Sequence, residues 1–211
     1  MVPGDAATTF TNLLTSEGLF RLRIVGFLLM LAADAVVAWA LYVVLRLVSQ
    51  SLSLLAAVFR WVYTTIHGAA LLNLVSVLRL VSGADASTAL GGDLVQAQAL
   101  RLLQGHNDGF LIGLVFFGVH LALLGYLVFR TGYLPRVLGV LLVLAAGSYV
   151  LDSLVNFLLT NYADYVALFL LIVAVPSIIA ELSLCLWLLL KGANANGRNS
   201  HTAEPFRVGV G

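Results

Sequence analysis

The sequence predicts an all-α fold, a polytopic bundle of five membrane-spanning helices. The prediction follows from composition, because 61% of the 211 residues are hydrophobic, only 10% are charged, and the mean hydropathy is +1.03. A soluble domain is about half apolar and about a quarter charged, and it covers its core with residues such as Lys, Glu and Asp. The 11 basic and 10 acidic residues of this chain are too few for such a surface. We therefore expect lipid to cover it.

Each predicted helix is a run of mostly apolar residues long enough to cross a bilayer. About 20 residues are needed, because the hydrocarbon core is about 30 Å thick and a helix rises about 1.5 Å per residue. Short polar turns at Ser49 and near Pro135 join the first pair of runs and the second pair as antiparallel hairpins. The five runs are approximately residues 19–47, 54–81, 109–129, 134–159 and 165–190.

Two parts of the chain lie outside these runs. Residues 83–104 include the moderately amphipathic stretch LVQAQALRLL, for which we predict a short extramembrane helix, at the membrane interface or packed over the bundle. Residues 193–211 are polar and rich in Asn and Gly, which predicts a disordered tail. The sequence thus predicts one transmembrane domain, residues 1–192, followed by a polar C-terminal tail.

Basic residues beside the spans predict the orientation, because cytoplasmic flanks carry an excess of Arg and Lys. Most of these basic residues lie at one end of the predicted bundle, which we assign to the cytoplasm. Arg21 and Arg23 lie at the other end and oppose that assignment. We expect a multi-pass protein of the cell membrane with a cytoplasmic C-terminus and an extracytoplasmic N-terminal segment. The residues at the first end are Arg46, Arg60, Arg130, Arg136, Lys191 and Arg198.

Ionisable side chains at membrane depth are the first candidates for a site, because they are costly in hydrocarbon unless they face the bundle interior and find a partner. Asp34, His67, His120 and Glu181 lie near the middle of four different predicted spans. Two imidazoles and two carboxylates can bind a divalent metal or relay protons. The alternative, which we rank first, is that each group is satisfied by a neighbouring side chain.

The sequence predicts no bound cofactor. A metal site would use His67, His120 and Glu181, but no HExxH, paired ExxH or CxxC motif accompanies them. His67 and His120 on neighbouring helices also match a bis-histidine haem arrangement, which we rank below a metal. The net charge of +1, without a basic run, argues against nucleic acid as a partner. The expected partners are membrane lipids and a second copy of the chain.

A second candidate site is an outer-leaflet polar pocket made of Asn73, Arg79, Asp152 and Asn156. Arg60, by contrast, is expected to reach the membrane interface by snorkelling, in preference to pairing with a carboxylate or a lipid phosphate.

Glycines recur through the third predicted span, where small residues let helices approach closely. We expect them to serve packing within the bundle rather than dimerisation. They are Gly109, Gly113, Gly118 and Gly125.

A run from Gly109 to Leu154, GFLIGLVFFGVHLALLGYLVFRTGYLPRVLGVLLVLAAGSYVLDSL, resembles the signature of the domain-of-unknown-function family DUF4386, uncharacterised prokaryotic polytopic membrane proteins. The segments VPGDAATTFTNLLTSEGLFRL, RWVYTTIHG and AELSLCLWLLLKG are similar to that family too. The resemblance implies a fold but no activity. It also implies a further spanning helix before Val2, giving six spans in the family against five here.

Three functions remain open. The leading hypothesis is a non-enzymatic bundle that binds a small or lipid-like ligand or serves as an accessory subunit, because no nucleophile motif, phosphate loop or cofactor fingerprint is present. The alternatives are an intramembrane metal-dependent hydrolase or redox protein, and a proton-coupled transporter, both using the mid-membrane His, Asp and Glu residues.

Overall fold

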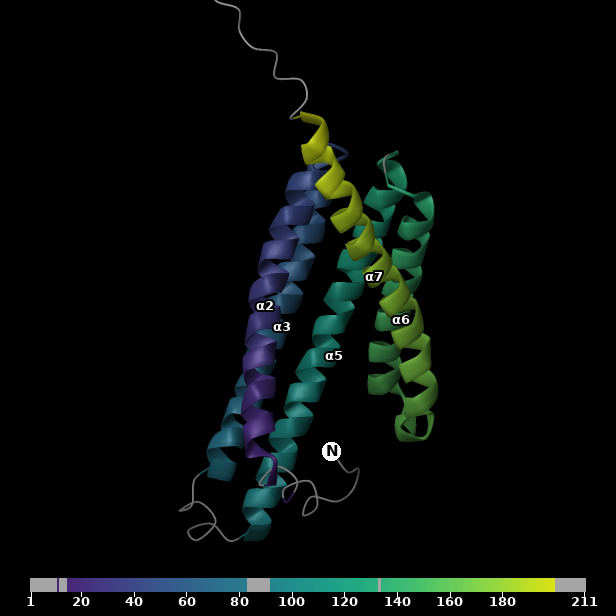
Figure 1. Ribbon diagram of the computed structural model, residues 1–211. Coiled ribbons are helices and arrows are strands. Elements are labelled where there is room, and N and C mark those ends of the chain that lie inside the picture. The colour runs from purple at the N-terminus through teal and green to yellow at the C-terminus, as the bar shows by residue number, and fades with distance from the viewer. Residues whose placement is uncertain (1–10, 12–14, 83–91, 133, 200–211) are drawn as a thin grey trace, which may run out of the picture.

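The protein is a bundle of long helices (Figure 1). The computed structural model describes residues 11, 15–82, 92–132 and 134–199. All regular structure in these residues is helical, which confirms the predicted all-α class. The elements are α2 (Glu17–Leu45), α3 (Gln50–Ser82), α5 (Gly92–Arg130), α6 (Arg136–Leu158), the short 3₁₀ helix η1 (Tyr162–Tyr165) and α7 (Val166–Asn199).

Five of these helices are long and apolar enough to cross a membrane, as the sequence predicted. The spans are the whole of α2, α3, α5 and α6 and residues Val166–Leu190 of α7. Large apolar side chains stay exposed along the outer helices, for example Leu170 and Leu171 of α7 at 64% and 62%. Such surfaces are typical of a multi-pass membrane protein.

The third span differs from the predicted one. We expected a separate extramembrane helix in residues 83–104, but residues from Gly92 onward are the first turns of α5, a single helix of 39 residues. No proline interrupts residues 92–109, and one face of this stretch is buried through Val95, Ala99 and Leu103. A continuous helix keeps that face against α2 and α3. Residues 83–91 lie outside the described residues.

The central helix of the bundle is α5, with α3 packed along one side and α6 along the other. The glycines of α5 make these contacts close. A Cβ atom added at Gly109 would lie 2.6 Å from the Cβ of Ala70 in α3, and one added at Gly125 would lie 2.7 Å from the carbonyl oxygen of Gly139 in α6. The predicted role of these glycines in packing within the bundle is confirmed.

Two apolar cores follow one another along the bundle. The larger lies mostly among α3, α5, α6 and α7. The smaller lies among α2, α3 and the N-terminal half of α5, and Figure 1 shows these three helices extending past the end of the α6 and α7 hairpin. At about 1.5 Å per residue, α5 is about 58 Å long, longer than the hydrocarbon core is thick. The smaller core therefore extends the bundle past the length of α6.

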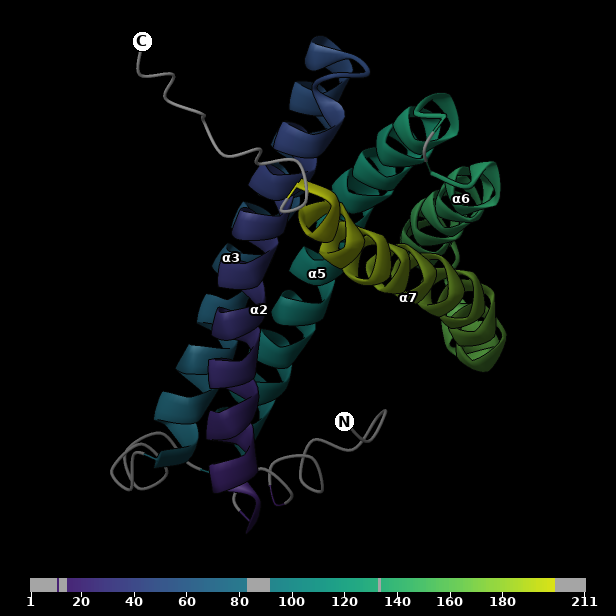
Figure 2. The same ribbon diagram turned by 45° about the horizontal axis from the view of Figure 1, so that its top comes forward.

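The last helix runs obliquely from α6 toward the α2 and α3 pair, as Figures 1 and 2 both show. It packs against α6 along its first part. The helix continues to Asn199, so residues 193–199, which we expected to belong to a disordered tail, are helical. The rest of the predicted tail, residues 200–211, lies outside the described residues.

Candidate functional site

Arg60 is the centre of a polar network at membrane depth. Its Nε donates a hydrogen bond to Oδ1 of Asp34 at 3.1 Å, and its Nη2 donates to the same oxygen. The side chains are 14% and 12% exposed, respectively. Arg60 lies ten residues into α3, about 15 Å from the helix start. The prediction that Arg60 snorkels to the interface is wrong, because Asp34 of α2 offers a counterion at the same depth.

His120 completes this network from α5. The Nη1 atom of Arg60 lies 3.2 Å from Nε2 of His120, and because a guanidinium can only donate, Nε2 must accept. The ring proton then lies on Nδ1, which donates to the carbonyl oxygen of Ala56 at 2.8 Å. His120 is 1% exposed. The geometry thus fixes a neutral imidazole in one tautomer, joined to the Arg60 and Asp34 pair.

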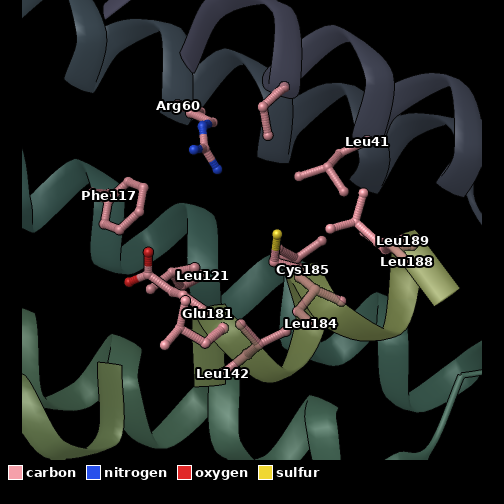
Figure 3. A pocket seen from close by; sticks show the side chains of 13 residues that line it. Leu41, Arg60, Phe117, Leu121, Leu142, Glu181, Leu184, Cys185, Leu188 and Leu189 are labelled. Carbon is pink, nitrogen blue, oxygen red and sulfur yellow. The ribbon is translucent and has the colours of Figure 1, made fainter. Parts of the chain in front are cut away.

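A cavity of about 470 Å³ opens beside Arg60. Figure 3 shows Arg60 and Glu181 directed toward this space from opposite walls, with the Cys185 sulfur directed into it. The remaining wall is apolar. The lining residues are Val37 and Leu41 of α2, Arg60 of α3, Phe117, Leu121 and Leu124 of α5, Leu142 of α6, and Glu181, Leu182, Leu184, Cys185, Leu188 and Leu189 of α7.

Glu181 is held in this wall by a neutral partner. The hydroxyl of Tyr149, at the middle of α6, donates a hydrogen bond to Oε1 of Glu181 at 3.0 Å. Among the described residues, the ion pairs are Arg21 with Glu17 and Arg60 with Asp34, so Glu181 belongs to neither. One carboxylate at membrane depth is therefore paired with a cation, and the other has only a phenol.

His67 lies in a separate layer of aromatic rings. Its Nδ1 is 3.3 Å from the hydroxyl of Tyr63, and its ring centroid is 4.9 Å from that of Phe110 and 5.7 Å from that of His106. The Nε2 atom of this fully buried ring has no hydrogen-bond partner in the part of the chain that the structure describes. This layer lies between the two apolar cores. His67 thus faces the α2, α3 and α5 interface, away from the residues that line the cavity.

The four mid-membrane candidates do not form one cluster. Arg60 joins Asp34 and His120, and Glu181 shares the cavity wall with Arg60, but His67 does not join them. No group of three His, Cys, Asp or Glu side chains within the described ranges is arranged to hold a metal ion. The hypothesis of a metal bound by His67, His120 and Glu181 therefore finds no support in the geometry.

The predicted outer-leaflet pocket is divided between two helices. Asn73 and Arg79 belong to α3, and Asn73 packs against Gly105 of α5. Asp152 of α6 instead accepts a hydrogen bond of 2.6 Å from the hydroxyl of Tyr162 in η1, and Asn156 also contacts that hydroxyl. Burial first, and then this bond to Asp152, raises the pKa of Tyr162 to about 12. Asp152 and Asn156 of α6 therefore hold Tyr162 in the turn that leads into α7.

Sequence reasoning missed three participants, namely Arg60 as the hub, Tyr149 as the partner of Glu181, and Phe117. The guanidinium carbon of Arg60 lies 5.4 Å from the centre of the Phe117 ring. The signal for Arg60 was present, since a carboxylate such as Asp34 at mid-membrane needs a cation on a neighbouring helix. Nothing comparable marked the two aromatic residues.

Comparison with known proteins shows the family of this chain. The model of the family described as domain of unknown function (DUF4386) matches residues 1–192. The chain is similar to an uncharacterized protein of Archaeoglobus fulgidus, with 32% identity over 169 residues, which cover 80% of this chain and 83% of the relative. No solved structure matches the chain. The protein, a multi-pass helical bundle with five candidate spans, therefore belongs to the DUF4386 family.

Proposed function

We propose that the protein binds a small apolar or lipid-like molecule in the cavity between α2, α3, α5 and α7, without transforming it. The observation that carries the proposal is the cavity itself, about 470 Å³ of leucine-lined space with two ionisable side chains in its wall. Ligand pockets are typically apolar spaces of about 300–1,000 Å³ with a few polar groups that fix orientation. This cavity fits that description in both size and composition.

Access from the bilayer supports a ligand drawn from the membrane. The cavity is lined by Val37 and Leu41 of α2 and by Leu188 and Leu189 of α7. These two helices nevertheless do not pack extensively against each other. Both helices are largely exposed along their spans, each with 17% of its most apolar stretch buried. A molecule dissolved in the bilayer would therefore enter sideways between two weakly joined helices. Its apolar part would meet leucines, and its polar end would meet Arg60 and Glu181.

The test is photolabelling with a long-chain alcohol that carries a diazirine, added to the protein in lipid nanodiscs. Phe117 and Leu121 are 7% and 2% exposed and line the cavity, so we expect adducts at these two residues, mapped by mass spectrometry. Cys185→Trp should abolish these adducts by filling the cavity. Leu186→Trp is the matched control, since Leu186 is 57% exposed and does not line the cavity.

Adducts restricted to outward-facing residues, equal in both tryptophan variants, would contradict the proposal. The other hypotheses, a metal-dependent hydrolase or redox protein and a proton-coupled transporter, have no comparable observation in their favour among the described residues. The ligand-binding hypothesis therefore leads.

We also propose that the C-terminus is cytoplasmic and the N-terminal segment extracytoplasmic. Support comes from Arg46, Arg130 and Arg136, which lie at the end of the bundle where α7 terminates. In a Cys185→Ser background, Ser49→Cys should resist a membrane-impermeant maleimide in intact cells, and Asp164→Cys should react. The opposite labelling pattern would reverse the assignment.

A further inference from the structure

We propose that the cavity selects an organic cation with an apolar body, whose positive charge pairs with Glu181. This inference rests on the proposed function and adds the charge of the ligand to it. The two ionisable groups in the cavity wall offer a choice, because Arg60 could receive an anion and Glu181 could receive a cation. Their existing partners decide between these two.

Each nitrogen of the Arg60 guanidinium already donates one hydrogen bond, and its charge is already paired. Two of its nitrogens donate to the Asp34 carboxylate, and the third donates to Nε2 of His120. The Asp34 charge cancels that of Arg60, and the guanidinium also lies over the Phe117 ring. An anionic headgroup would have to share the guanidinium with Asp34, which would place two negative charges beside one positive charge in a low-dielectric region where an unpaired charge is costly.

The carboxyl group of Glu181, unlike the Arg60 guanidinium, has no ion-pair partner among the described residues. Its contact with Tyr149 is a single hydrogen bond from a neutral donor to Oε1, and a carboxylate can accept several. The ionisable groups that act on it are Tyr149 of α6 and Arg60 of α3 with its counterion Asp34 of α2. With Arg60 and Asp34 cancelling, an ionised Glu181 gives the cavity one net negative charge.

The rest of the wall indicates the shape of the cation. Leucines, a valine, Phe117 and Cys185 surround the space, so a strongly hydrated ion would lose its water without replacement. A cation whose charge is spread over or shielded by apolar groups avoids that cost. A lipophilic amine or a quaternary onium ion has this chemistry, and the low dielectric around it strengthens its attraction to Glu181.

The experiment compares two probes of the same shape and opposite charge, tetraphenylphosphonium and tetraphenylborate, by equilibrium dialysis against the protein in nanodiscs, with empty nanodiscs subtracted. We expect tetraphenylphosphonium to bind and tetraphenylborate not to bind. Glu181→Gln keeps a hydrogen-bond acceptor for Tyr149 but loses the charge, so it should weaken cation binding by about tenfold or more. Glu181→Asp should retain part of it.

Asp93→Asn is the matched control, because Asp93 is an exposed carboxylate at the start of α5, outside the cavity wall. It should leave cation binding unchanged. Three results would overturn the inference. They are tetraphenylborate binding as tight as that of tetraphenylphosphonium, no binding of tetraphenylphosphonium, and unchanged tetraphenylphosphonium binding in Glu181→Gln. If the neutral diazirine alcohol still labels Phe117 and Leu121, only the charge preference fails. If that labelling is also lost, the proposed function fails with it.

Discussion

Removing the charge of Asp34 should destabilise the bundle strongly, because Arg60 would keep its charge at membrane depth without a counterion. Asp34→Asn is nearly isosteric and keeps one oxygen, and both Arg60 bonds go to a single oxygen of Asp34. The loss is therefore mainly electrostatic. Two unit charges about 4 Å apart attract by about 4 kcal/mol at an effective dielectric of about 20, and breaking a buried pair costs about 3–5 kcal/mol. With both side chains at most 14% exposed, we expect a value in that range.

The assay is reversible unfolding of the purified protein in mixed micelles by SDS, followed by circular dichroism, together with thermal unfolding. A loss of about 3–5 kcal/mol should lower the Tm by about 6–20 °C for a chain of this size. The double variant Asp34→Leu with Arg60→Met removes both charges and replaces them with apolar groups. It should recover much of the loss, because replacing a buried ion pair with hydrophobic residues is often nearly neutral.

Two results would refute this reasoning. One is an Asp34→Asn variant within about 1 kcal/mol of the wild-type protein, which would mean that water or lipid headgroups reach Arg60. The other is a double variant as unstable as the sum of its single variants, which would mean that the two side chains are not coupled.

Two further predictions follow from contacts outside the network. Gly125→Ala should lower the free energy of unfolding in SDS by about 1–3 kcal/mol, because its Cβ would lie 2.7 Å from the carbonyl oxygen of Gly139. Gly147→Ala is the control, since an added Cβ there has no atom within 4 Å, and it should change stability by less than about 0.5 kcal/mol. Equal effects of the two substitutions would contradict the packing role of Gly125. The pKa of Tyr162 is raised from 10.0 to about 12 by burial and by its bond to Asp152, so its stabilising contribution is present below pH 10 and lost as the pH approaches 12. The difference in ultraviolet absorbance between wild type and Tyr162→Phe should show a phenol ionising near pH 12, and ionisation near pH 10 would contradict the hydrogen bond.

The fold was predictable because membrane spans depend on long apolar runs, which the sequence displays directly. The spans matched to within a few residues at most ends, but the start of α5 did not. The stretch from Gly92 to Gln104 carries an amphipathic pattern that suits either a separate helix or an extension of the third span. Only the packing of Ala99 and Leu103 in the smaller core with residues of α2 and α3 decides between these.

The position of a side chain along its membrane span could be predicted from the sequence, but the direction in which the side chain points around the helix could not. His67 and Glu181 both lie within their spans as expected, yet His67 faces the aromatic layer and Glu181 faces the cavity. Arg60 was misplaced because its pairing with Asp34 depends on how α2 and α3 are turned toward each other, which the sequence does not show.

The most direct test of the central claim, a ligand cavity beside Arg60 and Glu181, is an experimental structure of the protein in a lipid phase. We expect electron density from a bound apolar molecule between α2 and α7, with its polar end at Glu181. An α7 helix packed directly on α2, with leucine side chains filling the space and no room for a ligand, would contradict it.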